Sequence, residues 1–173
     1  MPRHRDERLA LRFPGLYDRL MRRVLALPVG SPLRQRVTKR LASRAFEAFS
    51  RGDTESVLLA FHPEVEIQVI AGKALGLSAH YRGHEGMRAW MRDWRSVWGD
   101  YDEVLEQLID LGDSVITRSK INVRGERSGV EVTHTAGSQA HFTEGKITRW
   151  DAYVDWSDLV AARTPEGDTQ AAV

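Results

Sequence analysis

Residues 144–155, with the sequence EGKITRWDAYVD, decide the fold that we expect for this chain. Glu144 and Gly145 form a turn signal, because glycine tolerates the positive φ that a tight hairpin turn requires. After the turn, β-forming residues alternate between two faces, as they do along a strand. One face carries Ile147, Arg149, Asp151 and Tyr153, and the other carries Thr148, Trp150, Ala152 and Val154. The stretch therefore predicts a long last strand, and we expect its apolar side to line a cavity.

Three further strand patterns precede this stretch, at residues 101–111, 114–124 and 129–142. Gly112 and Asp113 form a hairpin signal between the first two, so the patterns predict an antiparallel meander. An earlier segment, residues 64–70, alternates apolar and polar side chains and predicts another half-buried strand. The carboxyl-terminal half of the chain is thus expected to form a sheet.

The amino-terminal half predicts helices. Residues 33–51 carry an apolar stripe at helical spacing, and Pro32 and Gly52 are typical of its first turn and its end. Asp53 is expected to cap a short helix that Pro63 stops. Residues 71–83 contain three glycines and no clear period, which predicts a loop.

The most apolar helix is expected at residues 83–99. Its apolar face carries Met87, Trp90, Met91, Trp94 and Trp98, while arginines take the opposite face. Such a face indicates either a plain core or the aromatic wall of a pocket. Buried indole N–H groups need hydrogen-bond partners, which suits a cavity with some polar contents. Both interpretations stay open at this point.

Helices followed by an antiparallel meander are typical of an α+β fold. A single sheet of this length must curl over the helices to bury one face, and the result is a cone with a mouth. We expect a curved antiparallel or mixed sheet wrapped around amino-terminal helices, in a domain spanning residues 33–163. Residues 1–32 would form a basic helical arm, and residues 164–173 a flexible polar tail.

The arm carries an unusual share of the positive charge. Residues 1–40 hold eleven Lys or Arg against three Asp or Glu, whereas the rest of the chain holds fourteen against twenty-one. Apolar residues at helical spacing predict a helix over about residues 16–26, after an interruption at Pro14 and Gly15. A basic amphipathic helix suits anionic lipid or nucleic acid. Aromatic residues are sparse, however, so we expect packing on the domain or a partner subunit, no nucleic acid, and membrane contact as the less favoured alternative.

The composition excludes several classes of protein and site. No apolar run reaches the length of a membrane span, and charges interrupt the apolar stretch that a signal peptide would need. The chain has no cysteine, which excludes disulfides and thiolate chemistry and agrees with a cytoplasmic location. Its histidines lack metal-ligand spacing, and it has neither a glycine-rich phosphate loop nor a serine nucleophile elbow. We therefore expect no metal and no cofactor.

Five short stretches are similar in order and spacing to a known family. They are AFSRGD (48–53), FHPEVE (61–66), YRGHEG (81–86), LIDLGD (108–113) and GKITR (145–149). Together they make residues 33–162 resemble the SnoaL-like proteins of the nuclear-transport-factor-2-like superfamily. The resemblance implies a conical pocket inside a curved sheet, and a homodimer built sheet to sheet. It also implies a superfamily of polyketide cyclases, ketosteroid isomerases, epoxide hydrolases, dehydratases and binding proteins without activity.

An acid–base enzyme of this family needs a titratable side chain in the cone, where burial brings a carboxyl pKa towards neutrality. Asp151 is the first candidate. The resemblance places the family's catalytic aspartate at Ala152, one residue after Asp151. Because neighbouring residues of a strand point to opposite faces, Asp151 lies on the face of Arg149. There it suits a surface or interface ion pair as well as a catalytic role. In the ketosteroid isomerases, the resemblance places a catalytic aspartate at Ile67 and a tyrosine near Ala45. Neither side chain here can give or take a proton, so the ketosteroid isomerase mechanism is disfavoured.

His134 is the second candidate, on the apolar face of the strand at residues 129–142. A catalytic histidine and a hydrogen-bonded core histidine both fit this position. For a ligand pocket we expect Trp90, Trp94, Trp150, Tyr81, His80 and Met87. Two functions remain open. One is cofactor-free acid–base catalysis of the cyclase, isomerase, hydrolase or dehydratase type on an apolar small molecule. The other is a non-catalytic ligand-binding or dimerisation module.

Overall fold

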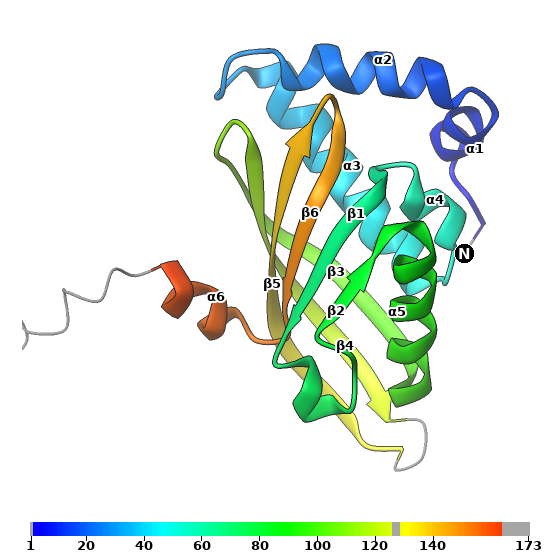
Figure 1. Ribbon diagram of the computed structural model, residues 1–173, viewed down its shortest axis with the longest axis vertical. Helices are drawn as coiled ribbons and strands as arrows, with labels where there is room; N and C mark the ends of the chain where they lie inside the picture. The colour runs from blue at the N-terminus through cyan, green and yellow to red at the C-terminus, as the bar shows by residue number, and fades with distance from the viewer. Residues whose placement is uncertain (1, 126–128, 164–173) are drawn as a thin grey trace, which may run out of the picture.

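The computed structural model describes residues 2–125 and 129–163, which form a curved sheet with helices packed against it (Figure 1). The helices are α1 (Arg5–Arg12), α2 (Pro14–Leu25), α3 (Pro32–Ser50), α4 (Thr54–Leu58), α5 (Gly83–Val97), α6 (Trp156–Arg163) and the short 3-10 helix η1 (Gly72–Leu75). The strands are β1 (Phe61–Ile70), β2 (His80–Arg82), β3 (Trp98–Asp110), β4 (Ser114–Gly125), β5 (Glu131–Thr143) and β6 (Lys146–Tyr153). This is the α+β architecture that the sequence predicts.

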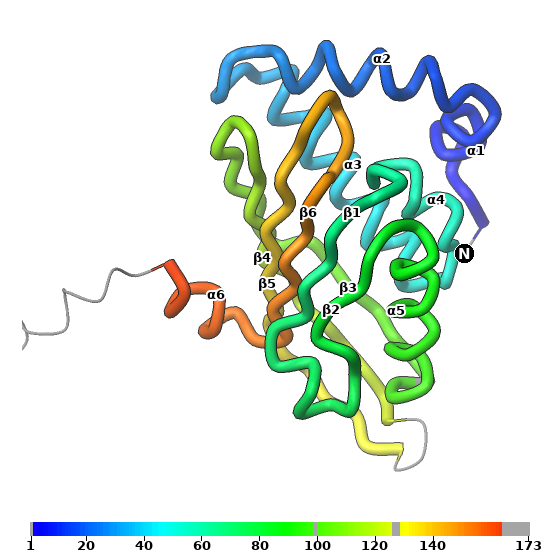
Figure 2. Tube along the Cα trace, in the orientation of Figure 1, coloured from blue at the N-terminus to red at the C-terminus, as the bar shows by residue number. Residues whose placement is uncertain are grey.

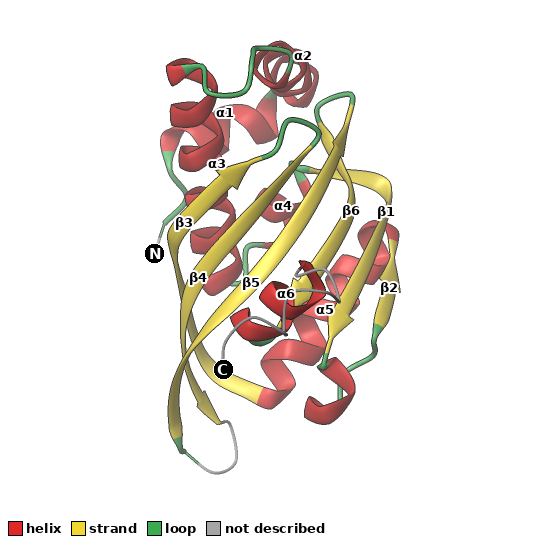
Figure 3. Cartoon of the chain, turned by 90° about the vertical axis from the view of Figure 1, so that its left-hand side faces the viewer, coloured by secondary structure: helices red, strands yellow, loops and turns green. Residues whose placement is uncertain are grey.

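The strand order in the sheet is β2-β1-β6-β5-β4-β3. Strands β3 to β6 form the predicted antiparallel meander, and β1 pairs in parallel with β6, so the sheet is mixed. The parallel pair joins distant parts of the chain, with Ile67 opposite Trp150. Figure 3 shows how strongly the sheet twists, which lets it wrap around its concave side.

Local sequence signals fix the corner between α3 and β1. Gly52 ends α3 with a φ of 74°, a conformation that side chains with a Cβ adopt at a cost. Asp53 then caps α4, since its Oδ1 accepts a hydrogen bond from the backbone N of Ser56 at 3.3 Å. Both residues act as the sequence predicts, and they direct the chain from the concave side into the sheet.

Three boundaries differ from the sequence prediction. Residues 71–83 are not a plain loop, because they contain η1 and the short edge strand β2, which pairs with β1. Strand β1 begins at Phe61, and Pro63 lies within it where the register with β6 shifts, a position that tolerates a missing N–H. Helix α5 ends at Val97, and Trp98 begins β3 while its indole still packs on the core.

The main core lies between α5, β1 and the end of α3. Its buried members are Ala48, Phe49, Val57, Leu58, Phe61, Val65, Ile67, Val69, Leu77, Met87, Trp90, Met91 and Trp94. The apolar face of α5 and the apolar face of β1 thus meet each other, as their two periodicities require. This packing fixes α5 on the concave side of the sheet.

The basic arm packs on the domain through both of its helices. In α1, Glu7 accepts a hydrogen bond from Arg51 at 2.6 Å, and Asp6 accepts one from Arg40 at 2.8 Å. Helix α2 lies across one end of the molecule, and the turn between β5 and β6 reaches up to it (Figure 2). The arm is therefore a lid-like layer over one end of the sheet.

Arg34 of α3 fastens the end of this layer. Its guanidinium is 3% exposed and donates to both carboxylate oxygens of Asp110, at 2.6 and 2.8 Å. It also donates to the carbonyl oxygens of Leu25, Leu27 and Gly112 at 2.5–2.8 Å. A buried charge is tolerated when it is paired and its hydrogen bonds are satisfied. One side chain thus joins α2, α3 and the turn between β3 and β4.

Helix α6 lies on the convex face of the sheet (Figure 3). Gly137 leaves room for it, because a Cβ there would lie 2.8 Å from Cδ1 of Leu159. The Arg118 guanidinium lies 5.7 Å from the ring centre of Trp156, within the range of a cation–π contact. The predicted tail at residues 164–173 lies outside the described residues. Within the described ranges, no helix is both long and apolar enough to cross a bilayer.

Candidate functional site

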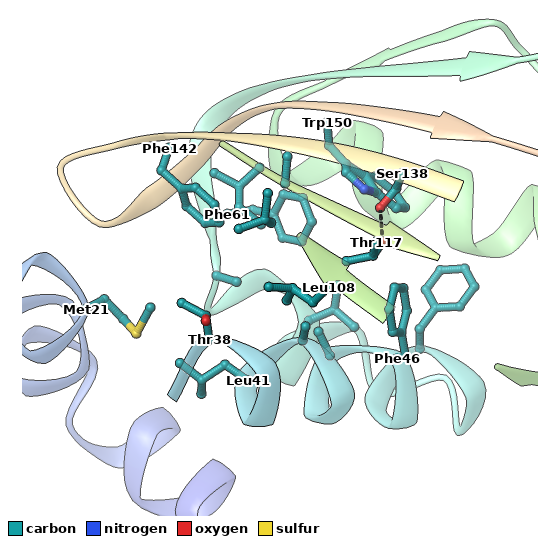
Figure 4. Close-up of a pocket in the computed structure, with 18 of the residues that line it drawn as sticks. Met21, Thr38, Leu41, Phe46, Phe61, Leu108, Thr117, Ser138, Phe142 and Trp150 are labelled. Carbon is teal, nitrogen blue, oxygen red and sulfur yellow. Dashed lines mark hydrogen bonds between the residues drawn. The ribbon is translucent and has the colours of Figure 1, made fainter. Parts of the chain in front are cut away.

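A cavity lies between α3 and the concave face of the sheet (Figure 4). Its volume is about 110 Å³, several times the roughly 10–15 Å³ that one water molecule needs on the same measure. Side chains from α2, α3, α5 and all the long strands line it, and most of them are apolar. The cone that the sequence predicts is therefore hollow rather than filled by its own side chains.

Aromatic rings form one wall of the cavity. The ring centre of Trp90 lies 4.6 Å from that of Phe49 and 4.8 Å from that of Trp150, with the two indoles nearly perpendicular. Phe61 meets Trp150 edge-on at 5.8 Å. Rings that hold one another at these distances make a rigid apolar surface. Such a wall suits a flat, apolar ligand.

Helix α2 closes the cavity at one end. Tyr17, Met21 and Leu25 line the cavity from this helix, and Figure 4 shows Met21 reaching towards it. Burial raises the pKa of Tyr17 to about 12, with Asp18 adding to the rise. The Tyr17 hydroxyl is therefore neutral at physiological pH. A ligand that enters or leaves the cavity at this end must pass these three side chains.

Two contacts hold α2 against the sheet. The Lys146 ammonium lies 2.6 Å from Oδ1 of Asp18 and also donates to the carbonyl oxygen of Leu59 at 2.7 Å. At the turn before β6, a Cβ on Gly145 would lie 2.9 Å from the backbone N of Arg22, so only glycine allows this approach. The position of the lid is thus set by an ion pair and by a close backbone contact.

Glu103 of β3 is the only carboxyl group among the described residues that line the cavity. Its Oε1 accepts a hydrogen bond from the Ser119 hydroxyl at 2.5 Å, and its Oε2 accepts one from the Tyr101 hydroxyl. Burial raises the pKa of Glu103 to about 7, although both hydroxyl groups oppose the rise. Near neutral pH the carboxyl is present in both its protonated and ionised forms. It can therefore give or take a proton.

Glu103 is held in place by its neighbours. Its backbone N donates to the Ser50 hydroxyl at 3.0 Å, which ties β3 to the end of α3. Burial and the neighbouring carboxyl also raise the pKa of Tyr101 well above its usual value, so this phenol is a hydrogen-bond donor and not a base. The carboxyl thus sits in a fixed orientation on the cavity wall.

A pair of hydroxyl groups adds polarity on the opposite strands. The side-chain oxygens of Thr117 and Ser138 lie 2.7 Å apart, and Figure 4 shows this hydrogen bond beside Trp150. Because one hydroxyl donates to the other, the O–H of the accepting hydroxyl is left to donate to a ligand oxygen. Within the described part of the chain, no cluster of three His, Cys, Asp or Glu is arranged to hold a metal ion.

The structure brings together part of the ligand pocket expected from the sequence. Met87, Trp90 and Trp150 line the main cavity. Trp94 lines a second, smaller cavity of about 40 Å³, which shares Trp90 and Glu103 with the first. The tryptophan-bearing face of α5 is therefore both core and pocket wall, which joins the two interpretations left open by the sequence.

The other expected residues lie elsewhere. His80, Tyr81 and Asp151 line an open groove outside the cavity, together with Arg149. Nε of Arg149 donates to both carboxylate oxygens of Asp151 at 3.0 and 3.1 Å. This is the ion pair on the outer face that strand alternation indicates. Asp151 has no direct access to the cavity, and its role as a catalyst stays a prediction.

His134 faces the same side of the sheet as the cavity but does not appear in the described lining of either cavity. Burial lowers the pKa of His134, while the nearby Asp155 opposes the decrease. The ring is therefore mostly neutral at physiological pH. Its role in catalysis also stays a prediction, and the geometry favours Glu103 as the group that a ligand would meet.

Sequence reasoning missed Glu103 because both faces of β3 mix apolar and acidic residues. A register shift between Leu105 and Gln107 also exchanges the faces halfway along the strand. A usable signal existed in the pair Tyr101 and Glu103, two residues apart and directly after the tryptophan-rich helix. Such a pair shares one face of a strand and combines a carboxyl group with a donor.

Comparisons with known proteins agree with this architecture. A family model described as SnoaL-like domain matches residues 42–150. No curated protein matches the sequence. Among solved structures, TerC co-crystallised with polyporic acid is 23% identical and has a TM-score of 0.61, covering 70% of this chain and 94% of that chain.

Two further structures have the same fold. A nuclear-transport-factor-2-like protein of unknown function from Burkholderia pseudomallei is 20% identical, with a TM-score of 0.62 over 70% of this chain and 93% of that chain. A protein described as a SnoaL-like polyketide cyclase, from Jannaschia, is 14% identical, with a TM-score of 0.58 over 71% of this chain and 88% of that chain. At such identities the likeness shows the fold alone. The family model covers more than half of the chain, so together with the cone and its cavity it shows that this protein belongs to the SnoaL-like domain family.

Proposed function

We propose that this protein is an enzyme that binds an apolar small molecule in the cavity and transforms it by acid–base catalysis without a cofactor. The observation that supports this most is Glu103, a carboxyl group on a mostly apolar cavity wall with a pKa of about 7. A group with such a pKa changes its protonation state readily at physiological pH, which is what a general acid or base requires.

In this mechanism the ionised carboxylate of Glu103 removes a proton from a carbon atom next to a carbonyl group of the substrate. The protonated carboxyl then returns the proton to another atom of the same molecule or to a leaving oxygen. Tyr101 and Ser119 orient the carboxylate through their hydrogen bonds. The hydroxyl pair of Thr117 and Ser138 is available to bind the substrate oxygen. Reactions of the cyclase, isomerase and dehydratase types all begin with such a step.

The test uses 5-nitrobenzisoxazole, an apolar aromatic probe for a base in an apolar pocket. A base removes its ring C–H proton, the N–O bond breaks, and a coloured cyanophenolate forms. We expect the protein to accelerate this reaction, with a rate that rises with pH as Glu103 ionises, around an apparent pKa of about 7. Glu103→Gln is expected to lower the rate by roughly 10²- to 10⁴-fold.

Two control variants address the other candidates. Asp151→Asn removes a carboxyl group on the outer face, and His134→Gln removes the half-buried imidazole. Both are expected to leave the rate unchanged. If either variant abolishes the rate while Glu103→Gln keeps it, the catalytic role belongs to that residue and the assignment to Glu103 is wrong.

A second candidate function is a ligand-binding module without catalysis. It is favoured by Ala152, because the family resemblance gives this position to a catalytic aspartate and the side chain here is apolar. Polyporic acid, the compound crystallised with TerC, serves as a first test ligand. Quenching of tryptophan fluorescence by it, together with equal 5-nitrobenzisoxazole rates for the protein and Glu103→Gln, would support this second function.

We also propose a homodimer that uses the part of the convex face not covered by α6. Val104 and Ile109 of β3 are exposed there and offer an apolar contact. Light scattering on the purified protein tests this, and a monomeric mass would overturn it. The cytoplasm remains the compartment that we propose, on the composition alone.

A further inference from the structure

Helix α2 has one wide apolar face, and the domain covers only part of it. Met21 and Val24 are buried on the part that faces the domain. Along the uncovered edge of the same face, Leu16 is 64% exposed and Leu20 is 53% exposed, and Phe13, directly before the helix, is 49% exposed. The packing that we expected for the arm therefore uses only part of its apolar face. The exposed three side chains are here called the outer apolar row.

The charges of the arm are divided between acidic residues that pair with the domain and arginines that are exposed to solvent. Its three acidic residues all pair with the domain, Asp6 with Arg40, Glu7 with Arg51 and Asp18 with Lys146. Six arginines are left on the outside, here called the outer arginines: Arg5, Arg8, Arg12, Arg19, Arg22 and Arg23. Among the residues that the structure describes, none of these six lies within ion-pair distance of a carboxylate. The outer surface of the arm is thus strongly positive.

The arrangement of the helix leaves this surface accessible. In Figure 1, α2 forms the outermost layer at one end of the longest axis of the molecule, and the sheet lies entirely below it. By helical spacing, Leu16 and Leu20 lie next to Arg19 and Arg23 on one side of α2. Apolar side chains and arginines thus share a surface that can meet a flat partner.

We propose that the outer face of α2 docks on an anionic lipid bilayer, with the outer apolar row inserted among the headgroups and the outer arginines of this helix on the lipid phosphates. A helix with exposed large apolar side chains beside arginines is suited to the boundary between headgroups and acyl chains. The negative potential of an anionic membrane surface attracts each of the arginines.

Two other partners fit the same surface less well. A second copy of the chain would bring two sets of uncompensated arginines together, and like charges at an interface oppose association. A nucleic acid would pair with the arginines but leave the two exposed leucines without a partner, because bases stack on aromatic rings and phosphates bind cations. A bilayer satisfies both the charge and the apolar surface.

This docking places the cavity close to the membrane, since the inner face of the same helix closes the cavity through Tyr17, Met21 and Leu25. An apolar molecule dissolved in the bilayer would reach the protein at its lid. The inference does not depend on Glu103 or on any catalytic step, so the outcome of its test is independent of the proposed enzyme function.

The experiment is sedimentation of the full-length protein with vesicles. We expect it to pellet with phosphatidylcholine vesicles that contain about one third phosphatidylserine, to stay in solution with pure phosphatidylcholine, and to be released by salt as the charges are screened. Arg19→Glu with Arg23→Glu is expected to weaken binding at least about tenfold. Leu16→Ser with Leu20→Ser is expected to weaken it as well, while the salt dependence remains.

Matched controls change the same side chains elsewhere. Arg92→Glu with Lys73→Glu alters the same charge on α5 and η1, and Val132→Ser with Val160→Ser removes two exposed apolar side chains from β5 and α6. Both pairs are expected to keep vesicle binding, and circular dichroism checks that every variant is folded. The salt titration of the unchanged protein needs no variant and stands even if one fails to fold.

Several results would overturn the proposal. They are no sedimentation with anionic vesicles, equal loss in the control pairs, or binding that is insensitive to salt. A second copy of the chain would be the partner if the protein does not bind vesicles and Leu16→Ser with Leu20→Ser converts a dimer to a monomer. A nucleic acid would be the partner if the protein binds labelled single-stranded RNA and does not bind vesicles.

Discussion

Glu103 illustrates how the environment of one side chain sets its chemistry. The described lining of the main cavity holds no lysine, arginine or histidine beside it, so nothing there compensates the negative charge. Two hydroxyl donors, from Tyr101 and Ser119, lessen the cost of ionisation without removing it. The balance leaves the pKa near the physiological range rather than near that of an ordinary carboxyl group.

The first prediction concerns stability as a function of pH. The pKa of Glu103 is about 7 in the folded chain against 4.5 for the ordinary group. Between these two values the folded chain binds more protons than the unfolded chain, so the free energy of unfolding falls as pH rises through the window. We expect this residue to account for a decrease of about 1–3 kcal/mol.

Glu103→Gln keeps a neutral polar group between the two hydroxyl donors. It is expected to flatten the decrease and to be more stable than the unchanged protein above the window. Chemical denaturation of both proteins across the window measures this. Parallel pH profiles for the two proteins would show that Glu103 has an ordinary pKa and would remove the main support for the proposed mechanism.

At the scale of elements, α2 is held by the burial of Met21 and Val24 and by three further contacts. Lys146 holds its middle, Arg34 holds its end, and the turn at Gly145 touches its backbone. Only the last of these contacts requires a particular residue for steric reasons. The turn between β5 and β6 therefore serves two purposes, reversing the chain and seating the lid.

The second prediction compares two glycines with the same backbone conformation. Gly145 and Gly30 have φ values of 85° and 89°, so alanine at either position costs about 1 kcal/mol of backbone strain. Only at Gly145 would the added Cβ press on Arg22, since Gly30 has nothing within 4 Å. Gly145→Ala is expected to speed tryptic cleavage within α2 by severalfold, whereas Gly30→Ala leaves it near that of the unchanged protein.

Cleavage at the arginines of α2 is read by mass spectrometry, and hydrogen exchange of the same segment gives a second measure. Equal cleavage in the two variants would mean that the lid does not rest on the turn. Slower hydrogen exchange in Gly145→Ala would contradict the steric argument directly.

At the scale of the whole molecule, much of the fold follows from periodicity. Alternation in the last four strands and helical spacing in α3 and α5 predict a sheet that is covered by helices. The curvature of the sheet and its cavity are predicted from the need to bury one face of the sheet. The parallel pairing of β1 with β6 could not be read in this way, because pairing between distant strands leaves no local pattern. Glu103 was missed because the register shift between Leu105 and Gln107 interrupts the alternation along β3 from which its inward orientation could have been predicted.

The third prediction follows from this pairing. A chain ending at residue 143 keeps α1 to α5 but lacks β6 and α6, so β1 loses its parallel partner and β5 becomes an edge. It is expected to lose cooperative thermal unfolding. A chain ending at residue 163 contains all six strands of the described sheet and is expected to unfold cooperatively. Circular dichroism compares them, and a cooperative transition in the shorter chain would show that the pairing is dispensable.

The order of the strands also governs how the protein forms on the ribosome. Ile67 and its partner Trp150 are separated by about eighty residues, which take roughly 4–16 s to synthesise at about 5–20 residues per second. Helix α5 emerges soon after β1 and can shield its apolar side chains, but the free edge of β1 stays open until the last strand leaves the exit tunnel. The nascent chain thus exposes an unpaired strand edge for seconds. A chaperone that covers this edge would act during that interval.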